Sequence, residues 1–129
     1  MAHFTIDYSP NLEGKLDFAD FCNAIRIAAV ETGVFPVAGI RVRATACNHV
    51  SIADGNPQHG FIDISIRLRA GRSDDAKKSA TAHVFEAART FLEPALSSNP
   101  IALSLEMRDI DPDLSPKTGT IRDYLESHS

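Results

Sequence analysis

The sequence repeats one hydrophobic pattern in its two halves, and this repeat is the strongest constraint on its fold. In each half, two segments of alternating apolar and polar residues flank a longer segment whose apolar residues recur every three to four positions. Alternation is typical of a half-buried strand, and the longer spacing is typical of an amphipathic helix. The expected strands lie at 3–8, 40–47, 61–69 and 101–108, and the expected helices at about 15–32 and 74–93.

The second helix carries signals for both of its ends. Ser73 is suited to cap the N-terminus, and Asp74 and Asp75 lie in the first turn, where the helix dipole favours acidic side chains. Pro94 is expected to end or kink the helix, because proline has no N–H to donate to the preceding turn. After the last strand, a segment rich in proline and glycine is expected to lead to a short polar helix near 120–127.

Two successive strand–helix–strand units define the fold class. Each helix must cross back over the sheet so that the two strands of its unit can pair in parallel. Two helices on one face of a four-stranded sheet form a two-layer α/β sandwich. We expect residues 1–129 to form a single domain of this kind.

The sheet face that no helix covers is expected to be polar and rich in arginine. It is either a solvated face, as in sheets packed on one side only, or a subunit interface with salt bridges, and the pattern favours neither. The residues expected on this face are His3, Thr5, Asp7, Arg41, Arg43, Asp63, Ser65, Arg67, Arg69, Ser104, Glu106 and Arg108.

Composition argues against several classes of protein. The net charge of −4 is opposite in sign to the basic face that non-specific nucleic-acid binding requires. No stretch approaches the ~20 apolar residues of a membrane span, and the start of the chain lacks a signal-peptide pattern. The two cysteines are too few for a disulfide framework. We therefore expect a soluble cytoplasmic protein that binds neither nucleic acid nor membrane.

Five segments, taken in order, carry a resemblance to a known family. They are His3-Phe4 near the start, TGVFPVAGIRVR from Thr32 to Arg43, Ala53-Asp54-Gly55, Ala70-Gly71-Arg72-Ser73, and Ala102-Leu103-Ser104-Leu105-Glu106. This set resembles the 5-carboxymethyl-2-hydroxymuconate isomerases, a branch of the tautomerase superfamily, over roughly residues 2–125. No single segment is diagnostic, and the ordered set is the signal.

The resemblance has implications for fold and function. It implies a tautomerase-type sandwich with a mixed sheet, assembled as a homotrimer whose sheets pack around the threefold axis. It implies keto-enol isomerisation of 5-carboxymethyl-2-hydroxymuconate, or of a similar unsaturated polycarboxylate, in the aerobic breakdown of homoprotocatechuate. It also implies a site near the N-terminus of each subunit and no metal or organic cofactor.

Such a reaction needs a base that moves a proton, and cations that hold carboxylates and stabilise the dienolate. Arginine suits the second task, because its planar fork pairs with a carboxylate through two hydrogen bonds. The resemblance makes Arg41 and Arg72 the expected catalytic and substrate-binding arginines. Arg72 has independent support, because it precedes a helix N-terminus, where anions bind readily. Arg43 is a third substrate-binding candidate and is equally suited to a subunit interface.

The sequence departs from the family at the expected base. The family uses an N-terminal proline, freed by loss of the initiator methionine, and this chain has Ala2 in its place. If Met1 is removed, Ala2 presents a primary amine that can act as the base. If Met1 stays, the amine lies one residue away, about 3.4 Å along an extended strand. The alternative to an enzyme is a catalytically inactive protein that binds a carboxylate ligand or serves in assembly.

Overall fold

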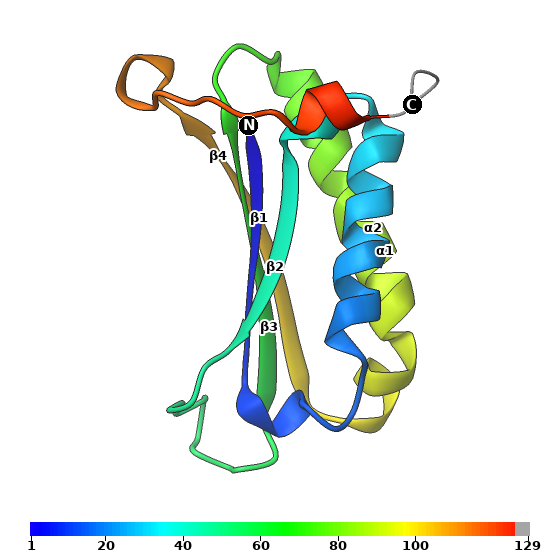
Figure 1. Ribbon diagram of the computed structural model, residues 1–129. Helices are drawn as coiled ribbons and strands as arrows, with labels where there is room; N and C mark the ends of the chain where they lie inside the picture. The colour runs from blue at the N-terminus through cyan, green and yellow to red at the C-terminus, as the bar shows by residue number, and fades with distance from the viewer. Residues whose placement is uncertain (126–129) are drawn as a thin grey trace.

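The computed structural model describes residues 1–125, and within them six main elements follow the predicted order (Figure 1). The two strand–helix–strand units predicted from the sequence are confirmed. The elements are β1 (Ala2–Tyr8), α1 (Phe18–Thr32), β2 (Ile40–Ala46), β3 (Gly60–Arg69), α2 (Asp74–Ser98) and β4 (Ile101–Ile110).

The four strands form one mixed sheet in the order β2-β1-β3-β4. β1 pairs in parallel with β2, and β3 pairs in parallel with β4, as each crossover helix requires. The two units join through the antiparallel pair β1 and β3. Both helices lie side by side on one face of the sheet, so the predicted two-layer sandwich is confirmed (Figure 1).

The core lies between the sheet and the two helices. Alternate residues of the central strands point into it, including Phe4 and Ile6 of β1 and Ile64 of β3, each 0% exposed. Burying a side chain of this size contributes about 1.5–3 kcal/mol of transfer free energy. The helices add the apolar stripes predicted from their spacing, with Phe21 and Ile25 of α1 among the fully buried residues.

The predicted end of the second helix at residue 93 is wrong, because α2 passes through Pro94 and continues to Ser98. Its N-terminus is as predicted, with the Ser73 side chain accepting the Ala76 N–H at 3.1 Å. A proline inside a helix costs about 3 kcal/mol. The extra turn counteracts part of this cost, because it buries Ala95, which is 8% exposed, and packs Leu96 against the core.

The remaining differences concern the ends of elements. α1 starts at Phe18 rather than near residue 15, because the Asp17 side chain caps it by accepting the Asp20 N–H at 3.0 Å. The short helix predicted near 120–127 is a single 3-10 turn, Ile121–Tyr124. Residues 126 and 127 of that prediction lie outside the part of the chain that the structure describes.

The second face of the sheet carries the predicted polar residues, and neither helix covers it (Figure 1). Hydrogen bonds link some of them across neighbouring strands. Ser104 donates to the Asp63 carboxylate at 2.7 Å, and Arg108 donates to the Ser65 hydroxyl at 3.3 Å. Among the described residues, no helix is long and apolar enough to span a membrane.

Candidate functional site

The starts of β1 and β2 lie next to each other at one end of the sheet. The register of these parallel strands pairs Ala2 with Ile40, so the chain start lies beside the residue that precedes β2. That residue is Gly39, and a Cβ built on it would lie 2.8 Å from the Met1 nitrogen. The missing side chain at position 39 therefore makes room for the terminal amine.

The C-terminal tail, residues 111–125, crosses the same end of the sheet. β4 ends there because it runs antiparallel to β1, and β4 is the edge strand opposite β2. From this edge the tail runs past the N-terminus towards α1 (Figure 1). The Arg69 guanidinium donates to the Ser115 carbonyl at 3.3 Å, and the Asp111 side chain accepts the Asp113 N–H at 2.9 Å. These contacts fix the direction in which the tail leaves β4.

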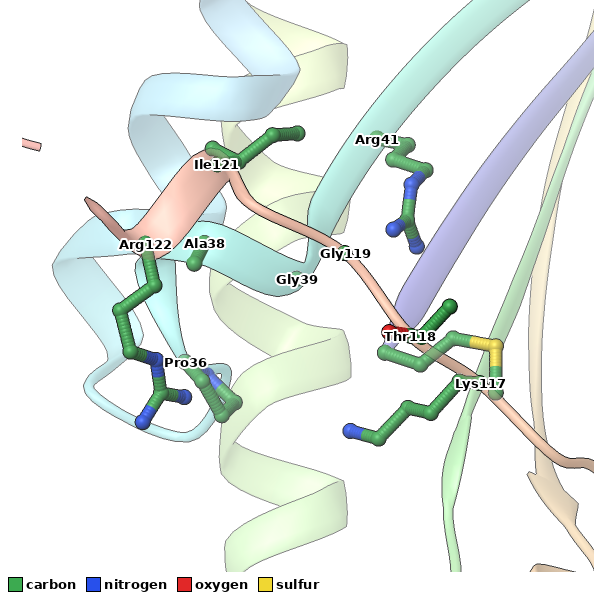
Figure 2. Close-up of a pocket in the computed structure, with 10 residues that line it drawn as sticks. Pro36, Ala38, Gly39, Arg41, Lys117, Thr118, Gly119, Ile121 and Arg122 are labelled. Atoms are coloured by element: carbon green, nitrogen blue, oxygen red, sulfur yellow. The ribbon is translucent and has the colours of Figure 1, made fainter. Parts of the chain in front are cut away.

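The chain start, the beginning of β2 and the tail enclose a pocket of about 320 Å³. Three side chains that line it are cationic, namely Arg41 of β2 and Lys117 and Arg122 of the tail, and Figure 2 shows all three around the same hollow. None of the described residues that line it is acidic. Its lining residues are Met1, Pro36, Ala38, Gly39, Arg41, Lys117, Thr118, Gly119, Ile121 and Arg122.

The terminal amine in this pocket is a stronger candidate base than an ordinary α-amino group would be. Burial, then the charge and a side-chain hydrogen bond of Lys117, and then the charges of Arg41 and Arg72 together lower the pKa of the Met1 amine from its usual 8.0 to about 6. All of these causes disfavour the protonated form. The amine is therefore mostly neutral, and able to accept a proton, at pH 7.

Of the four predicted site residues, Ala2, Arg41, Arg43 and Arg72, Arg41 alone lines this pocket. Ala2 is 0% exposed in β1, one residue after the amine. Arg72 is close enough to lower the pKa of the amine, but it lies outside the pocket lining. Its guanidinium donates to two backbone carbonyls, those of Val34 at 3.3 Å and Arg69 at 3.1 Å.

Arg43 lies on the same strand face as Arg41, two residues farther from the chain start. It does not line the pocket, and its guanidinium lies 3.2 Å from Nδ1 of His3. Burial, followed by the charges of Arg67, Arg43 and Arg41, lowers the pKa of His3, so this ring is suited to accept a hydrogen bond from Arg43. The substrate-binding role of Arg43 stays a prediction.

Sequence reasoning gave no role to Lys117 and Arg122. Both lie more than 70 residues after Arg41, in a tail for which the sequence predicts only an irregular segment and a short polar helix near 120–127. Only the position of β4 at the far edge of the sheet brings them to the chain start. The one local signal is a lysine between Pro116 and Gly119, which predicts an irregular segment but not its course.

The pocket combines the two features that a proton transfer next to carboxylates requires. A neutral amine can accept and return a proton, and cationic side chains can bind carboxylates and stabilise negative charge that develops during the reaction. Within residues 1–125, no group of three or more histidine, cysteine, aspartate or glutamate side chains is placed to hold a metal ion.

Comparisons with known proteins agree on one family. The family model described as 5-carboxymethyl-2-hydroxymuconate isomerase matches residues 2–125. The 5-carboxymethyl-2-hydroxymuconate Delta-isomerase of Escherichia coli is 28% identical over 121 residues, which cover 94% of this chain and 96% of that protein.

Solved structures are similar over nearly the whole chain. A crystal structure of 5-carboxymethyl-2-hydroxymuconate delta-isomerase matches with a TM-score of 0.91 and 27% identity, covering 98% of this chain and 94% of that one. A 5-carboxymethyl-2-hydroxymuconate isomerase from Deinococcus radiodurans R1 matches with a TM-score of 0.88 and 23% identity, covering 97% and 95%. A fused 4-OT, solved as a symmetric trimer, shares the fold, with a TM-score of 0.69 and 19% identity over 90% of this chain and 93% of that one.

Proposed function

Because this chain belongs to the 5-carboxymethyl-2-hydroxymuconate isomerase family and is therefore an isomerase, we propose that it catalyses keto-enol isomerisation of 5-carboxymethyl-2-hydroxymuconate or of a similar unsaturated polycarboxylate. The observation that carries the proposal is the free α-amino group in a pocket where every charged side chain among residues 1–125 of the lining is cationic. An amine of lowered pKa supplies the base, and the cations supply the binding sites for carboxylates.

In the proposed reaction, the neutral amine takes the proton from the enol hydroxyl of the substrate. The electron pair left on oxygen spreads over the conjugated carbons as a dienolate, and the protonated amine returns the proton to a carbon atom. The proton therefore leaves oxygen and arrives at carbon, and the enzyme ends in its starting state. Arg41 binds a substrate carboxylate in the pocket, and Arg72 stabilises the negative charge of the dienolate through its own charge.

The base is the α-amino group at whichever residue begins the chain. Ala2 carries it once Met1 has been removed, and its position in β1 is the one that proline occupies in the family. While Met1 is present, its amine lies in the pocket with a pKa of about 6. The two forms place the nitrogen about 3.4 Å apart, and an error of 1 Å in such a position can cost about a hundredfold in rate.

Turnover of 5-carboxymethyl-2-hydroxymuconate, followed by its ultraviolet absorbance and paired with the intact mass of the sample, tests the proposal. The positive control is an Ala2→Pro variant freed of Met1, which tests the pocket separately from the base. Activity in both proteins supports the proposal. An inert natural protein beside an active variant would instead favour the alternative, a carboxylate-binding protein without turnover.

A Gly39→Ala substitution distinguishes the two forms of the chain. With Met1 present, the new Cβ would lie 2.8 Å from the Met1 nitrogen and 3.2 Å from its Cα, so the amine must move. Without Met1, the nearest remaining atom is the Ala2 nitrogen at 3.6 Å, an ordinary contact. We expect kcat to fall roughly 10- to 100-fold only in the form that retains Met1. Parallel assays of both forms, with masses verified, check this, and an equal loss in both would contradict it.

The proposed assembly is a homotrimer whose arginine-rich sheet faces form the interface. These faces carry charged side chains that hydrogen bond within the sheet but are not covered by either helix. Light scattering should give a mass of about 42 kDa for three chains of 14.0 kDa. Because charged interfaces weaken with ionic strength, the trimer is expected to dissociate more readily at 1 M salt. A monomer at all protein concentrations would disprove the assembly.

A further inference from the structure

Lys117 is one of two cations that the C-terminal tail adds to the pocket, and Arg122 is the other. Contacts at Asp111 and Ser115 direct the tail across the end of the sheet. Two residues beyond Ser115, the Lys117 side chain enters the pocket opposite Arg41 (Figure 2). The tail thus forms one wall of the site.

Within residues 1–125, no acidic side chain lines the pocket to balance its positive charges. Among residues 1–125, neither Arg41, Lys117 nor Arg122 forms an ion pair, although ion pairs occur elsewhere on the surface. The chain as a whole is acidic, with a net charge of −4. A cluster of unpaired cations on an acidic protein is costly to assemble unless an anion binds it. Three cations around one pocket match a ligand with several carboxylates.

We propose that Lys117 is a substrate-binding residue, whose ammonium group binds one carboxylate of the polycarboxylate substrate beside the α-amino group. This inference rests on the proposed function and names a binding residue for the same site. Arg41 binds from β2 and Lys117 binds from the tail, so the substrate is held from both sides of the pocket. Lysine suits this position because its ammonium is a compact charge on a flexible four-carbon side chain.

The same position gives Lys117 a second effect, on the base. The charged groups around the amine are Arg41 of β2, Arg72 before α2, Lys117 and Arg122 of the tail, and His3 of β1, which is able to titrate. Lys117 is the charged residue that acts most strongly on the amine, through its charge and a side-chain hydrogen bond. Removing it is expected to raise the pKa of the amine towards its usual value.

The variants Lys117→Met and Lys117→Arg test the proposal, with Lys78→Met on the exposed surface of α2 as a matched control for loss of one lysine. At pH 9, where the amine is mostly neutral in every variant, Lys117→Met should raise KM roughly 10- to 100-fold and change kcat by less than about threefold. The pH at which kcat/KM rises should also be higher for Lys117→Met than for the natural protein. Lys117→Arg, which keeps the charge, should restore KM to within about fivefold.

Binding of trans-aconitate, an unsaturated tricarboxylate, provides a readout that needs no turnover. Calorimetry should show binding to the natural protein and to Lys78→Met, and roughly 10-fold or greater weakening in Lys117→Met. Equal binding by Lys117→Met and the natural protein, or no binding by the natural protein, would overturn the inference. Normal binding without any isomerisation would instead disprove the proposed function while leaving the role of Lys117 standing.

Discussion

Acetylating the α-amino group of the chain is expected to lower kcat roughly 10²- to 10⁴-fold, the usual contribution of a positioned general base. An amide nitrogen has no basic electron pair, so the acetylated protein cannot take the enol proton. The reaction can be directed to this amine because its pKa is about 6 when Met1 is present. Near pH 6.5 most of it is neutral and reactive, whereas ordinary lysines, with a pKa of about 10.4, are almost fully protonated.

The pH dependence of the unmodified enzyme checks the same assignment. Since the base must be neutral, kcat/KM of the form that retains Met1 should be low in acid, rise through pH about 6 and level off above it. A base with the usual α-amino pKa of 8.0 would place this rise two pH units higher. Peptide mapping must show that Lys117 is unmodified, and excess trans-aconitate should slow the acetylation. A fully acetylated protein with normal turnover would place the base elsewhere.

The fold followed from the sequence because its signals are local and repeated. Alternation in β1 and β3 fixes which residues face the helices, and Ser73 marks the start of α2 through a hydrogen bond that the structure contains. The predicted end of α2 is wrong because the intrinsic cost of Pro94 does not alone decide where the helix ends. After the proline, Ala95 is buried and Leu96 packs against the core, and a single-residue signal does not reveal such contacts.

The candidate site was predictable only where it depends on the strands. Arg41 lies beside the start of β1 because parallel pairing sets it opposite His3, and such pairing follows from the strand–helix–strand pattern. Lys117 reaches the same place through a tail whose course depends on the sheet order and on the contacts of Arg69 with Ser115. Neither the order of the strands in the sheet nor those contacts produce a periodic pattern in the sequence. Long-range packing therefore decided the part of the site that the sequence did not reveal.

Replacing Arg41 by alanine is expected to lower kcat/KM roughly 10²- to 10³-fold, because the pocket loses the forked donor that binds a substrate carboxylate. Arg41 is exposed in the single chain and makes no ion pair among the described residues, so its removal leaves no cavity within the subunit and no unpaired acidic partner. The stability of the folded subunit should therefore change by no more than about 0.5 kcal/mol. The kcat/KM of Arg41→Lys should lie between those of the natural protein and Arg41→Ala, since lysine keeps the charge but not the bidentate geometry.

Two further arginine variants make this result specific. Arg26→Ala, on the exposed surface of α1, controls for the loss of one positive charge and should leave kcat/KM within about twofold, because surface charges are screened. Arg43→Ala tests the predicted substrate-binding role of that residue, which lies against His3 rather than in the pocket. A loss as large as that of Arg41→Ala would show that Arg43 also acts on the substrate. A loss confined to Arg41→Ala would place the carboxylate at the mouth of the pocket, between β2 and the tail, where Lys117 faces it.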